Sequence, residues 1–590
     1  MNPDLLRRTL TVIIVAAALW CVATLLGAGF FVRLGPWVLS SHEPVRPAAL
    51  AALASAVYVL TFGVKSLTLA MQSVVEAVQR LSAPAAVALA VLTVGVGLRW
   101  ATYAASGADS YGYVSQADSW LGGHLRIAQP WVGQLPLPDA DRAFAPLGYR
   151  PGTQLHTIVP TYPAGVPIMM AIAKLLVGIR GPYIVVPLLG GFGVWLTYCL
   201  GRGLAAAFDG LMAAALLATS PAFVFQLLLP MSDIAAMTFW TLAAVLLLDR
   251  GRFSVVGAGL AASVAILIRP NLMPLTAVYG LSLAFPPVRT AQTVRAQLGG
   301  VALFAAAVVP GIAAVSALNW YLYGGPLRSG YGSVGEVYEL ANAAVNARRY
   351  AAWLWETQTR LILLAPLVLV LPGVLVRQNR QQAATASPRL LLSGIMVAVT
   401  GCYVFYGPFE DWSYLRFLLP AFPAMLVASV AGVSCVLRWL PAVWRSLLIL
   451  LLVSAAAVSQ GRMALERGAF KLQQQEQRYI AVARQVELLT PPDAMIICLQ
   501  HSGSVRYYAH RKTLRNDWLL PDWLDRAVEL LRERGYHPYI LLEDWEETPF
   551  RTKFGGLNRL GQLDIRSRLQ VSPGVWLHDA LDATARRPPA

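Results

Sequence analysis

The sequence predicts an α-helical polytopic membrane protein that carries a small α/β domain at its C-terminal end. Of the 590 residues, 57% are hydrophobic and only 13% are charged, a composition too apolar for a soluble globular domain. About thirteen apolar runs approach the roughly 20 residues that a membrane helix needs. Beyond residue 460, short strand patterns alternate with polar helical patterns. We therefore expect a membrane domain over residues 1–460 and an α/β domain over residues 461–590.

The first apolar run follows a short segment that contains Arg7 and Arg8. It is too long for the apolar core of a signal peptide and lacks a small-residue cleavage site, so we interpret it as the first span. The run at 166–179 has only 14 residues, contains Lys174, and fits an interfacial or re-entrant helix better than a span. The predicted spans are 10–32, 47–64, 83–98, 182–200, 211–229, 234–248, 255–268, 272–285, 298–322, 361–376, 390–406, 415–437 and 447–458.

Basic residues in the short loops predict the orientation of these spans. If the spans alternate, most of the basic residues fall on one side of the membrane, which the positive-inside rule makes the cytoplasmic side. The N-terminus is then cytoplasmic, whereas loops 104–160 and 323–356 and the C-terminal domain lie outside. The residues that carry this signal are Arg7, Arg8, Lys65, Arg80, Arg202, Arg250, Arg252, Arg289, Arg295, Arg377, Arg380, Arg389, Arg438 and Arg445.

The C-terminal segment has the pattern of a small α/β domain. A polar helical stretch at 462–489 precedes strands at 494–499, 539–542 and 575–578 and helices at 502–508 and 522–534. No Gly-rich phosphate motif opens any of these helices, so a nucleotide site has little support. His501 and Ser502 are adjacent on a predicted strand-to-helix turn, which favours a structural turn over a nucleophile pair.

The net charge of +16 does not indicate a nucleic-acid partner. The arginines are scattered singly between apolar runs, without a basic stripe interleaved with stacking aromatic residues, so the charge fits membrane orientation and anionic lipid. The five cysteines lack the spacing of a metal site or a disulfide framework. His124 and His156 also lack ligand spacing, and we predict no tightly held structural metal.

The motif Asp109-Ser-Tyr-Gly-Tyr113 is the most informative stretch of the sequence. It places a carboxylate and two tyrosines just beyond the third predicted span, close to the headgroup plane. An acid at a membrane exit suggests chemistry on a substrate held by a lipid. The alternative is a solvated loop acid beside ordinary tyrosines of an interfacial aromatic belt.

A second acid and two arginines lie at other predicted outer ends of spans. Asp233 follows the fifth span in a short turn, where a charge is costly unless it is solvated or paired; a helix N-cap is the alternative. Arg269 and Arg416 occupy short external turns, where an anionic headgroup would accept paired hydrogen bonds from each guanidinium. Interfacial anchoring is their alternative. Asp118 is a secondary acid candidate, for which a solvated helix face is favoured.

These motifs, in their order along about half of the chain, resemble the landmarks of the GT-C membrane glycosyltransferases. The resemblance is to bacterial relatives of dolichyl-phosphate-mannose protein mannosyltransferases and of the aminoarabinose transferase that acts on lipid A. Two predicted spans precede the usual first helix, which departs from the family pattern. The matching segments are Asp109–Tyr113 followed by Ala117 and Gly122-Gly123, Tyr162-Pro163-Ala164-Gly165, Ser220-Pro221, Ser232-Asp233, Tyr323-Gly-Gly-Pro-Leu-Arg328-Ser-Gly-Tyr331 and Arg416-Phe-Leu-Leu-Pro420-Ala-Phe-Pro423.

The resemblance implies a GT-C fold and inverting hexosyl or pentosyl transfer from a polyprenyl-phosphate carrier. The acceptor would be a glycan, lipid or protein at the outer face of a bacterial inner membrane. The family's first-loop acid maps onto Asp109 as general base. Asp233 is a second catalytic candidate, which would position the acceptor or orient an arginine. No cofactor is certain, because some relatives hold a divalent cation at the first-loop acid and others do not. The expected substrate-binding residues are Arg269, Arg328 and Arg416 for the phosphate, with Tyr113, Asp118, Tyr162 and Tyr331.

Two functions of other classes stay open at this point: a transporter or flippase of lipid-linked sugars, and an O-antigen polymerase or ligase. A transporter predicts repeat symmetry and broken helices near the midplane, and the sequence shows no internal repeat. The early position of Asp109 argues against a polymerase or ligase. A transferase predicts one outward-facing cavity lined by Asp109, Asp233, Arg269 and Arg416, whereas a transporter needs a path through the membrane.

Overall fold

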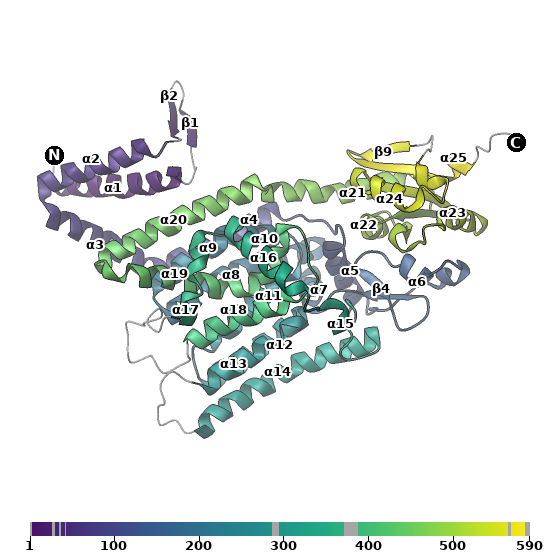
Figure 1. Cartoon of the computed structure of the whole chain (residues 1–590), viewed down its shortest axis with the longest axis horizontal. Coiled ribbons are helices and arrows are strands. Elements are labelled where there is room, and N and C mark those ends of the chain that lie inside the picture. Colours follow the sequence, from purple (N-terminus) through teal and green to yellow (C-terminus); the bar gives the residue numbers. More distant parts are fainter. Residues whose placement is uncertain are drawn as a thin grey trace.

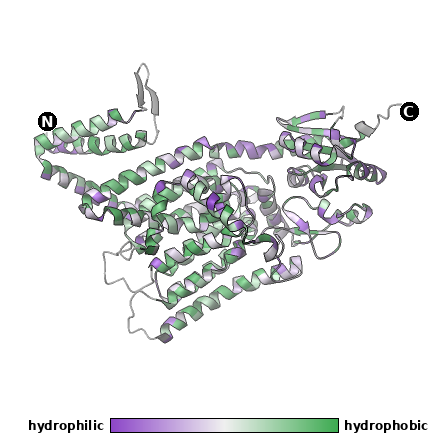
Figure 2. Cartoon of the chain, in the orientation of Figure 1, coloured by the Kyte–Doolittle hydropathy of each residue, from purple (hydrophilic) through white to green (hydrophobic). Residues whose placement is uncertain are grey.

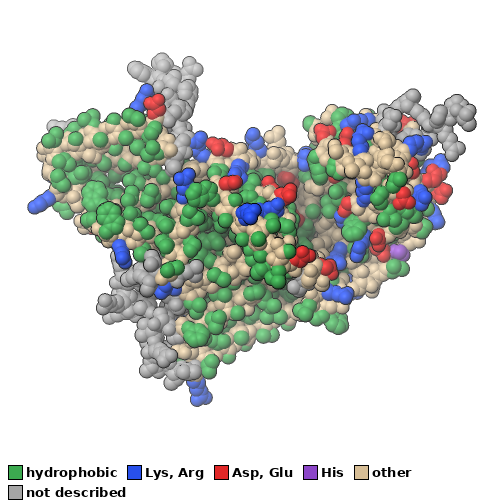
Figure 3. Space-filling view, in the orientation of Figure 1, with side chains coloured by type: hydrophobic (Ala, Val, Ile, Leu, Met, Phe, Trp, Pro, Cys, Tyr) green, Lys and Arg blue, Asp and Glu red, His purple; other side chains and the backbone are tan. Residues whose placement is uncertain are grey.

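A helical body and a C-terminal α/β domain are joined by one long helical arm in the computed structural model (Figure 1). The structure describes residues 3–25, 30–34, 37–41, 43–285, 294–370, 388–563 and 568–584. Helices α20 (Ala442–Glu466) and α21 (Leu472–Leu489) form the arm, which runs from the body to the sheet. The hydrophobic residues concentrate in the body and the first part of α20, and the hydrophilic residues in α21 and the α/β domain (Figure 2). Figure 3 shows the same division on the surface.

The body consists mainly of helices, with one short hairpin and one small sheet. Strands β1 (Phe30–Leu34) and β2 (Trp37–Ser41) pair antiparallel, and β3 (Ile127–Ala128), β5 (Thr157–Pro160) and β4 (Tyr149–Pro151) form a sheet in that order. The helices are α1 Pro3–Leu25, α2 Val45–Phe62, α3 Val64–Arg80, α4 Ser82–Trp100, α5 Asp109–Leu121, α6 Ala140–Ala143, α7 Gly165–Val177, α8 Gly181–Leu204, α9 Ala207–Thr219, α10 Pro221–Leu227, α11 Ser232–Leu246, α12 Arg252–Ile268, α13 Leu275–Ala284, α14 Val294–Tyr323, α15 Val334–Val337, α16 Asn342–Thr357, α17 Leu367–Val370, α18 Pro388–Val404 and α19 Phe422–Val436, with the 3-10 helix η6 at Trp412–Ala421.

Among the described residues, seven helical segments are long and apolar enough to cross a membrane, or eight if the bent pair α9 and α10 counts as one span. The predicted count of about thirteen is therefore not confirmed. Helices α11, α12 and α18 are apolar but have fewer than 18 residues, and α9 and α10 are bent by 63°. The bend falls where Ser220 ends one helix and Pro221, which lacks an N–H, begins the next.

Two segments differ from the loops and spans that the sequence suggested. The stretch after α2, which carries Lys65 and Arg80 and was expected to be a short loop, is the 17-residue helix α3. The run predicted to lie at the interface is α7. The chain turns sharply after it and brings Gly181 so close to α7 that a Cβ on this residue would lie 2.3 Å from the backbone of Ala173. Arg289, Arg377, Arg380 and the end of the predicted span 361–376 lie outside the described residues.

The α/β domain has a five-stranded sheet in the order β7-β6-β8-β10-β9. Strands β7, β6 and β8 are parallel, and β10 and β9 continue the sheet antiparallel. The strands predicted at 494–499, 539–542 and 575–578 are confirmed, whereas β7, β9 and α24 were not predicted. The elements are β6 Ala494–Cys498, α22 Ser502–Tyr508, β7 Lys512–Arg515, α23 Leu524–Glu533, β8 His537–Glu543, α24 Asp544–Phe554, β9 Arg568–Ser572, β10 Val575–Asp579 and α25 Ala580–Thr584.

One face of this sheet shares its hydrophobic core with the long loop between α4 and α7. Val132, Leu135 and Phe144 of that loop are buried in one cluster with Ile497 and Leu542 of the sheet. Burying such side chains stabilises a contact by about 1.5–3 kcal/mol each. The loop and the domain therefore hold each other in place, although about 350 residues separate them in the sequence.

Candidate active site

The first predicted acid, Asp109, begins helix α5, which packs between α7 of the body and α22 of the α/β domain. Residues 110–117 of α5 are buried, since the helix packs on α7 on one side and on α22 on the other. A Cβ on Gly503 of α22 would lie 2.2 Å from the ring of Tyr111, so the two helices are in close contact. The Asp109 side chain remains 31% exposed at the start of the helix. The acid is therefore fixed by its backbone and still accessible.

The hydroxyl of Tyr162 binds the carboxylate of Asp109. It donates to Oδ1 of Asp109, and the Tyr162 ring stacks on Tyr113 with the centroids 4.8 Å apart. This approach requires glycine at position 112, because a Cβ there would lie 2.3 Å from the Tyr162 ring. Burial raises the pKa of the Tyr162 hydroxyl well above its ordinary value, and the nearby charge of Asp109 raises it further, so the hydroxyl stays a donor.

The second acid, Asp233, lies in the first turn of α11 and is almost completely buried. Its Oδ1 accepts from Nη2 of Arg269 at 2.6 Å, and its side chain is 1% exposed. Arg269 leaves α12 at the residue before Pro270, where helical backbone is disfavoured. Its Nε donates to Ser232 Oγ at 3.1 Å and its Nη1 to Tyr403 Oη at 2.9 Å. The alternative of a capping role does not hold, since Asp233 pairs with an arginine instead.

Arg416 of η6 connects the two acids. Its Nη2 donates to Oδ2 of Asp109 at 2.9 Å, and its Nη1 lies 4.0 Å from Oδ2 of Asp233. The latter oxygen is buried and has no hydrogen-bond partner among the described residues. The cluster thus alternates in the order Asp109, Arg416, Asp233, Arg269. Two carboxylates balance two guanidinium groups, which limits the cost of burying these charges.

A cavity of about 850 Å³ adjoins this cluster. Its lining combines polar groups, namely Arg269, Ser232 and tyrosines 113, 162, 331 and 403, with apolar residues of α14 and α18 such as Ile312 and Ala398. The expectation of a cavity lined by all four charged residues is correct only for Arg269. Asp109 and Arg416 lie directly behind the wall, the first bonded to Tyr162 and the second with its guanidinium carbon 5.4 Å from the centre of the Phe417 ring.

The remaining predicted site residues lie in different places. Tyr331 lines the cavity, with its ring 6.1 Å from that of Tyr162. The preceding residue, Gly330, packs directly on the backbone of residue 161. A side chain does not fit there, since a Cβ on Gly330 would lie 1.8 Å from the backbone oxygen of residue 161. Arg328 is exposed and does not line the cavity. Asp118 is neither in the cavity nor a solvated helix face, because it pairs with Lys174 and accepts from Tyr507 Oη at 2.7 Å.

Three residues of the site were not predicted. Ser232 accepts from Tyr113 Oη at 2.8 Å as well as from Arg269, so it connects the tyrosine wall to the charges. Tyr403 of α18 bonds Arg269 and stacks on Phe417 with the centroids 4.9 Å apart. Ser232 stands next to the predicted acid Asp233, and this position could have indicated it as a site residue. Tyr403 and Phe417 lie in apolar runs, where aromatic residues are common for packing reasons alone.

The carboxylates of Asp109 and Asp233 are the ligand types that a divalent cation would use. Among the residues that the structure describes, no group of three or more His, Cys, Asp or Glu side chains gathers as a metal site. Both acids already have arginine partners. The arrangement is suited to binding an anion through the arginines and to accepting a proton at a carboxylate.

No family model matches the sequence, and no curated protein is detectably similar to it. Among solved structures, the chain is similar to ArnT from Cupriavidus metallidurans bound to undecaprenyl phosphate, with 12% identity and a TM-score of 0.46 over 84% of this chain and 98% of that one. It is similar to the oligosaccharyltransferase of Archaeoglobus fulgidus, with 13% identity and a TM-score of 0.44 over 79% and 70%. It is also similar to the arabinofuranosyltransferase AftD from mycobacteria, with 12% identity and a TM-score of 0.46 over 78% of this chain and 35% of that one. At this level of similarity, the function has to be argued from the geometry of the site.

Proposed function

We propose that this protein is an integral-membrane glycosyltransferase that moves a sugar from a polyprenyl-phosphate carrier to an acceptor at the outer face of the membrane. The observation that carries the proposal is the cavity lined both by apolar residues of α14 and α18 and by the guanidinium of Arg269. An amphiphile with a long apolar chain and a phosphate matches both kinds of lining. The ordered motifs that resemble GT-C enzymes point to the same substrate class.

The arginines are the phosphate-binding groups of this proposal. A guanidinium can give a phosphate two parallel hydrogen bonds, and a buried site makes such bonds stronger than in water. Arg269 lines the cavity directly, and Arg416 lies behind Phe417 in the same cluster. Arg328 is exposed at the loop and would contribute only if that loop closed over the carrier.

Asp109 is the proposed general base. Its carboxylate takes the proton from the acceptor hydroxyl while the hydroxyl oxygen attacks the anomeric carbon from the face opposite the phosphate. The bond between that carbon and the phosphate oxygen breaks, and the electron pair leaves with the polyprenyl phosphate. The sugar is transferred with inversion. The arginines stabilise the charge that develops on the leaving phosphate, so a strong general acid is not needed.

Asp233 has a positioning role in this scheme. Its Oδ2 lacks a hydrogen-bond partner and lies 4.0 Å from Arg416, whereas Asp109 Oδ2 lies 2.9 Å from the same guanidinium. A small movement of Arg416 toward Asp233 would complete the missing bond and release Asp109. A bound phosphate would favour that movement by competing with Asp109 for the guanidinium. Donor binding would thereby free the base.

The experiment that tests the function compares lipid-linked sugars and envelope glycans between a strain that lacks this protein and the same strain carrying wild-type or Asp109→Asn protein. Loss of one glycan, together with accumulation of one lipid-linked sugar, is the expected result, and only the wild-type protein should reverse it. The anomeric configuration of the restored linkage should be opposite to that of the carrier sugar. Unchanged glycans and carriers, or full reversal by Asp109→Asn, would refute the proposal.

The orientation of the chain is also a proposal, with the N-terminus inside and the α/β domain outside. Because Val132 and Leu135 share a core with Leu524, a cysteine introduced at Gln134 and one at Asp522 must report the same side of the membrane. An impermeant thiol reagent should label both in intact cells. A cysteine at Gln382, which lies outside the described residues, should be protected. Labelling at Gln382 would overturn the proposed orientation.

A further inference from the structure

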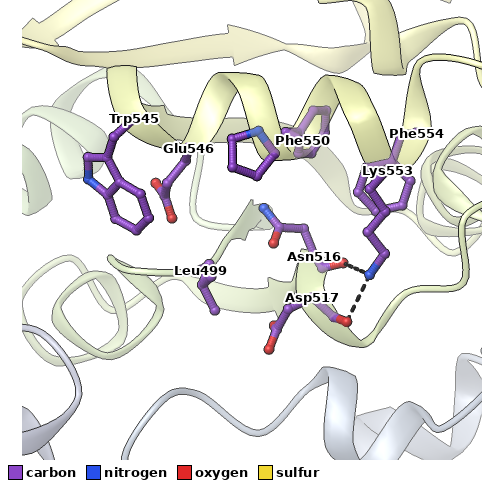
Figure 4. Close-up of a pocket in the computed structure, with 9 residues that line it drawn as sticks. Leu499, Asn516, Asp517, Trp545, Glu546, Phe550, Lys553 and Phe554 are labelled. Carbon is purple, nitrogen blue, oxygen red and sulfur yellow. Dashed lines mark hydrogen bonds between the residues drawn. The ribbon is translucent and has the colours of Figure 1, made fainter. Parts of the chain in front are cut away.

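The α/β domain contains a second, smaller cavity of about 170 Å³ at the carboxyl edge of its parallel strands (Figure 4). Leu499 follows β6 directly, Asn516 follows β7, and Trp545 follows β8 by two residues. All three line the cavity, and α24 covers it with residues along its length, from Trp545 to Phe554. This volume is below the range typical of drug-sized ligands, so the cavity suits a small ligand or one unit of a larger molecule.

The position of the cavity within the sheet is one at which α/β folds bind ligands. The helix after β6 packs on one face, where Val505 joins Ile496 in a buried cluster. The helix after β8 packs on the other face, where Phe550 joins Ile497. Adjacent parallel strands whose helices lie on opposite faces leave a crevice at their carboxyl ends, called a topological switch point.

A nearly buried amide without a partner points into this crevice. The Asn516 residue is 8% exposed, and no described residue makes a hydrogen bond with its side-chain amide. Figure 4 shows this amide directed toward the cavity, between Leu499 and α24. The amide is therefore available to bond a ligand or a water molecule that enters the cavity. An amide offers both a donor and an acceptor, which matches a hydroxyl group.

The charged side chains around the cavity are already held by partners within the domain, which favours a neutral ligand. Asp517 pairs with Arg515, whose Nε lies 3.0 Å from Oδ1. Glu546 accepts from the backbone N–H groups of Gln500 and Glu543 at 3.1 and 2.9 Å. Lys553 donates to two backbone carbonyls, at 3.0 and 2.8 Å, as the dashed lines in Figure 4 show. Each of these charged groups thus already has partners within the domain, so none is left free to select an ion.

An exposed aromatic side chain stands at the rim. Trp545 is 56% exposed, although its Nε1 is held by Glu543 at 2.8 Å, so the indole is both fixed and open to solvent. Phe550 and Pro549 extend the apolar wall. A rigid aromatic surface beside a few placed polar groups is the usual composition of a site for a small, partly apolar ligand.

We propose that this cavity binds one neutral sugar unit, with a C–H face of the ring against Trp545 and its hydroxyls on the amide of Asn516 and the ammonium of Lys553. A sugar supplies both an apolar face and paired donors and acceptors without charge. This site lies in the α/β domain and is separate from the proposed transfer site in the membrane domain.

A binding experiment on the full-length protein in lipid nanodiscs tests this proposal. The neutral probes are methyl glycosides of hexoses and pentoses, and the charged probes are methyl glucuronide and inorganic phosphate. Saturation-transfer NMR should detect at least one neutral glycoside and neither charged probe. Asn516→Leu and Trp545→Ala should each weaken binding by about tenfold, the value of one or two hydrogen bonds or an equivalent apolar contact. Leu488→Ala, an exposed apolar position on α21, is the matched control and should bind normally.

Two further readouts separate this site from a structural role and from the transfer site. Asn516→Leu should keep or raise the unfolding temperature if the amide serves a ligand, and a clear fall would mean that it serves the fold. Asp109→Asn should retain glycoside binding. Binding that survives both Asn516→Leu and Trp545→Ala, or binding only of a charged probe, or no binding of any neutral glycoside, would overturn the proposal.

Discussion

Replacing each acid of the central cluster by its amide should separate stability from catalysis. Asp233 is 1% exposed and its Oδ1 lies 2.6 Å from Arg269, which is itself nearly buried. Asp233→Asn leaves that guanidinium without its counter-charge, and removing one partner of a buried ion pair costs about 3–5 kcal/mol. Asp109 is 31% exposed, so water screens part of the loss in Asp109→Asn and the cost should be well below that range.

The catalytic effects should run in the opposite order. Asp109→Asn keeps the size of the side chain and an acceptor for Tyr162 but loses basicity, so transfer should fall by about 10²- to 10⁴-fold. The double variant Asp233→Asn with Arg269→Met removes both members of the buried pair. It should recover most of the stability lost in Asp233→Asn, because no unpaired buried charge remains.

Stability is measured by unfolding the purified variants in one lipid or detergent system. Transfer activity is measured by the consumption of a labelled polyprenyl-phosphate sugar. The reasoning fails if Asp109→Asn destabilises the protein more than Asp233→Asn does. It also fails if a stably folded Asp109→Asn protein transfers sugar at nearly the wild-type rate.

Three further variants have defined outcomes. Arg416→Lys should weaken carrier binding nearly as much as Arg416→Ala, by the 1.5–3 kcal/mol typical of a charge-assisted hydrogen bond, and wild-type affinity of the lysine variant in a lipid-binding assay would leave Arg416 as a membrane anchor. Gly503→Val should lower transfer with little change in unfolding of the α/β domain, because its side chain would push against Tyr111 and move α5; unchanged kinetics would show that α5 does not depend on this contact. Glu546→Gln should change the pH dependence of stability of the α/β domain. Burial raises the pKa of Glu546 to about 7, so the folded state binds the proton more tightly than the unfolded state and stability falls as pH rises from about 4.5 to 7, by about 3 kcal/mol in total. Unfolding measured by hydrogen exchange should lose this component in the glutamine variant, and identical pH profiles would contradict it.

The sequence indicated the charged residues of the site because charge is costly where a chain leaves a membrane. Asp109, Asp233, Arg269 and Arg416 each lie at a predicted outer end of a span, and the structure brings all four into one cluster from four separate elements. The sequence did not indicate which acid pairs with which arginine. The sequence suggested that the arginines face a ligand, whereas in the structure each also has an acidic partner, which only three-dimensional proximity reveals.

Helix α3, whose apolar side chains cover only one face, escaped the sequence analysis. Helix α3 has buried Met71 and Val75 on one side and charged residues on others, so its average composition resembles that of a polar loop. The core shared between Phe144 and the sheet was also invisible. Local patterns carry no information about a contact between segments about 350 residues apart in the sequence.

The alternation of charges in the cluster explains how a buried anion site can exist before its anion arrives. Two free guanidinium groups in a dry site would carry a desolvation cost of several kcal/mol each. Asp109 and Asp233 offset that cost in the unliganded protein, and Arg416 lies between them at 2.9 and 4.0 Å. A phosphate that enters from the cavity would compete with Asp109 for Arg416, while Asp233 keeps Arg269 in place. The proposed base would therefore gain its full proton affinity for an acceptor only when a carrier is bound, which would limit the activation of water at an empty site.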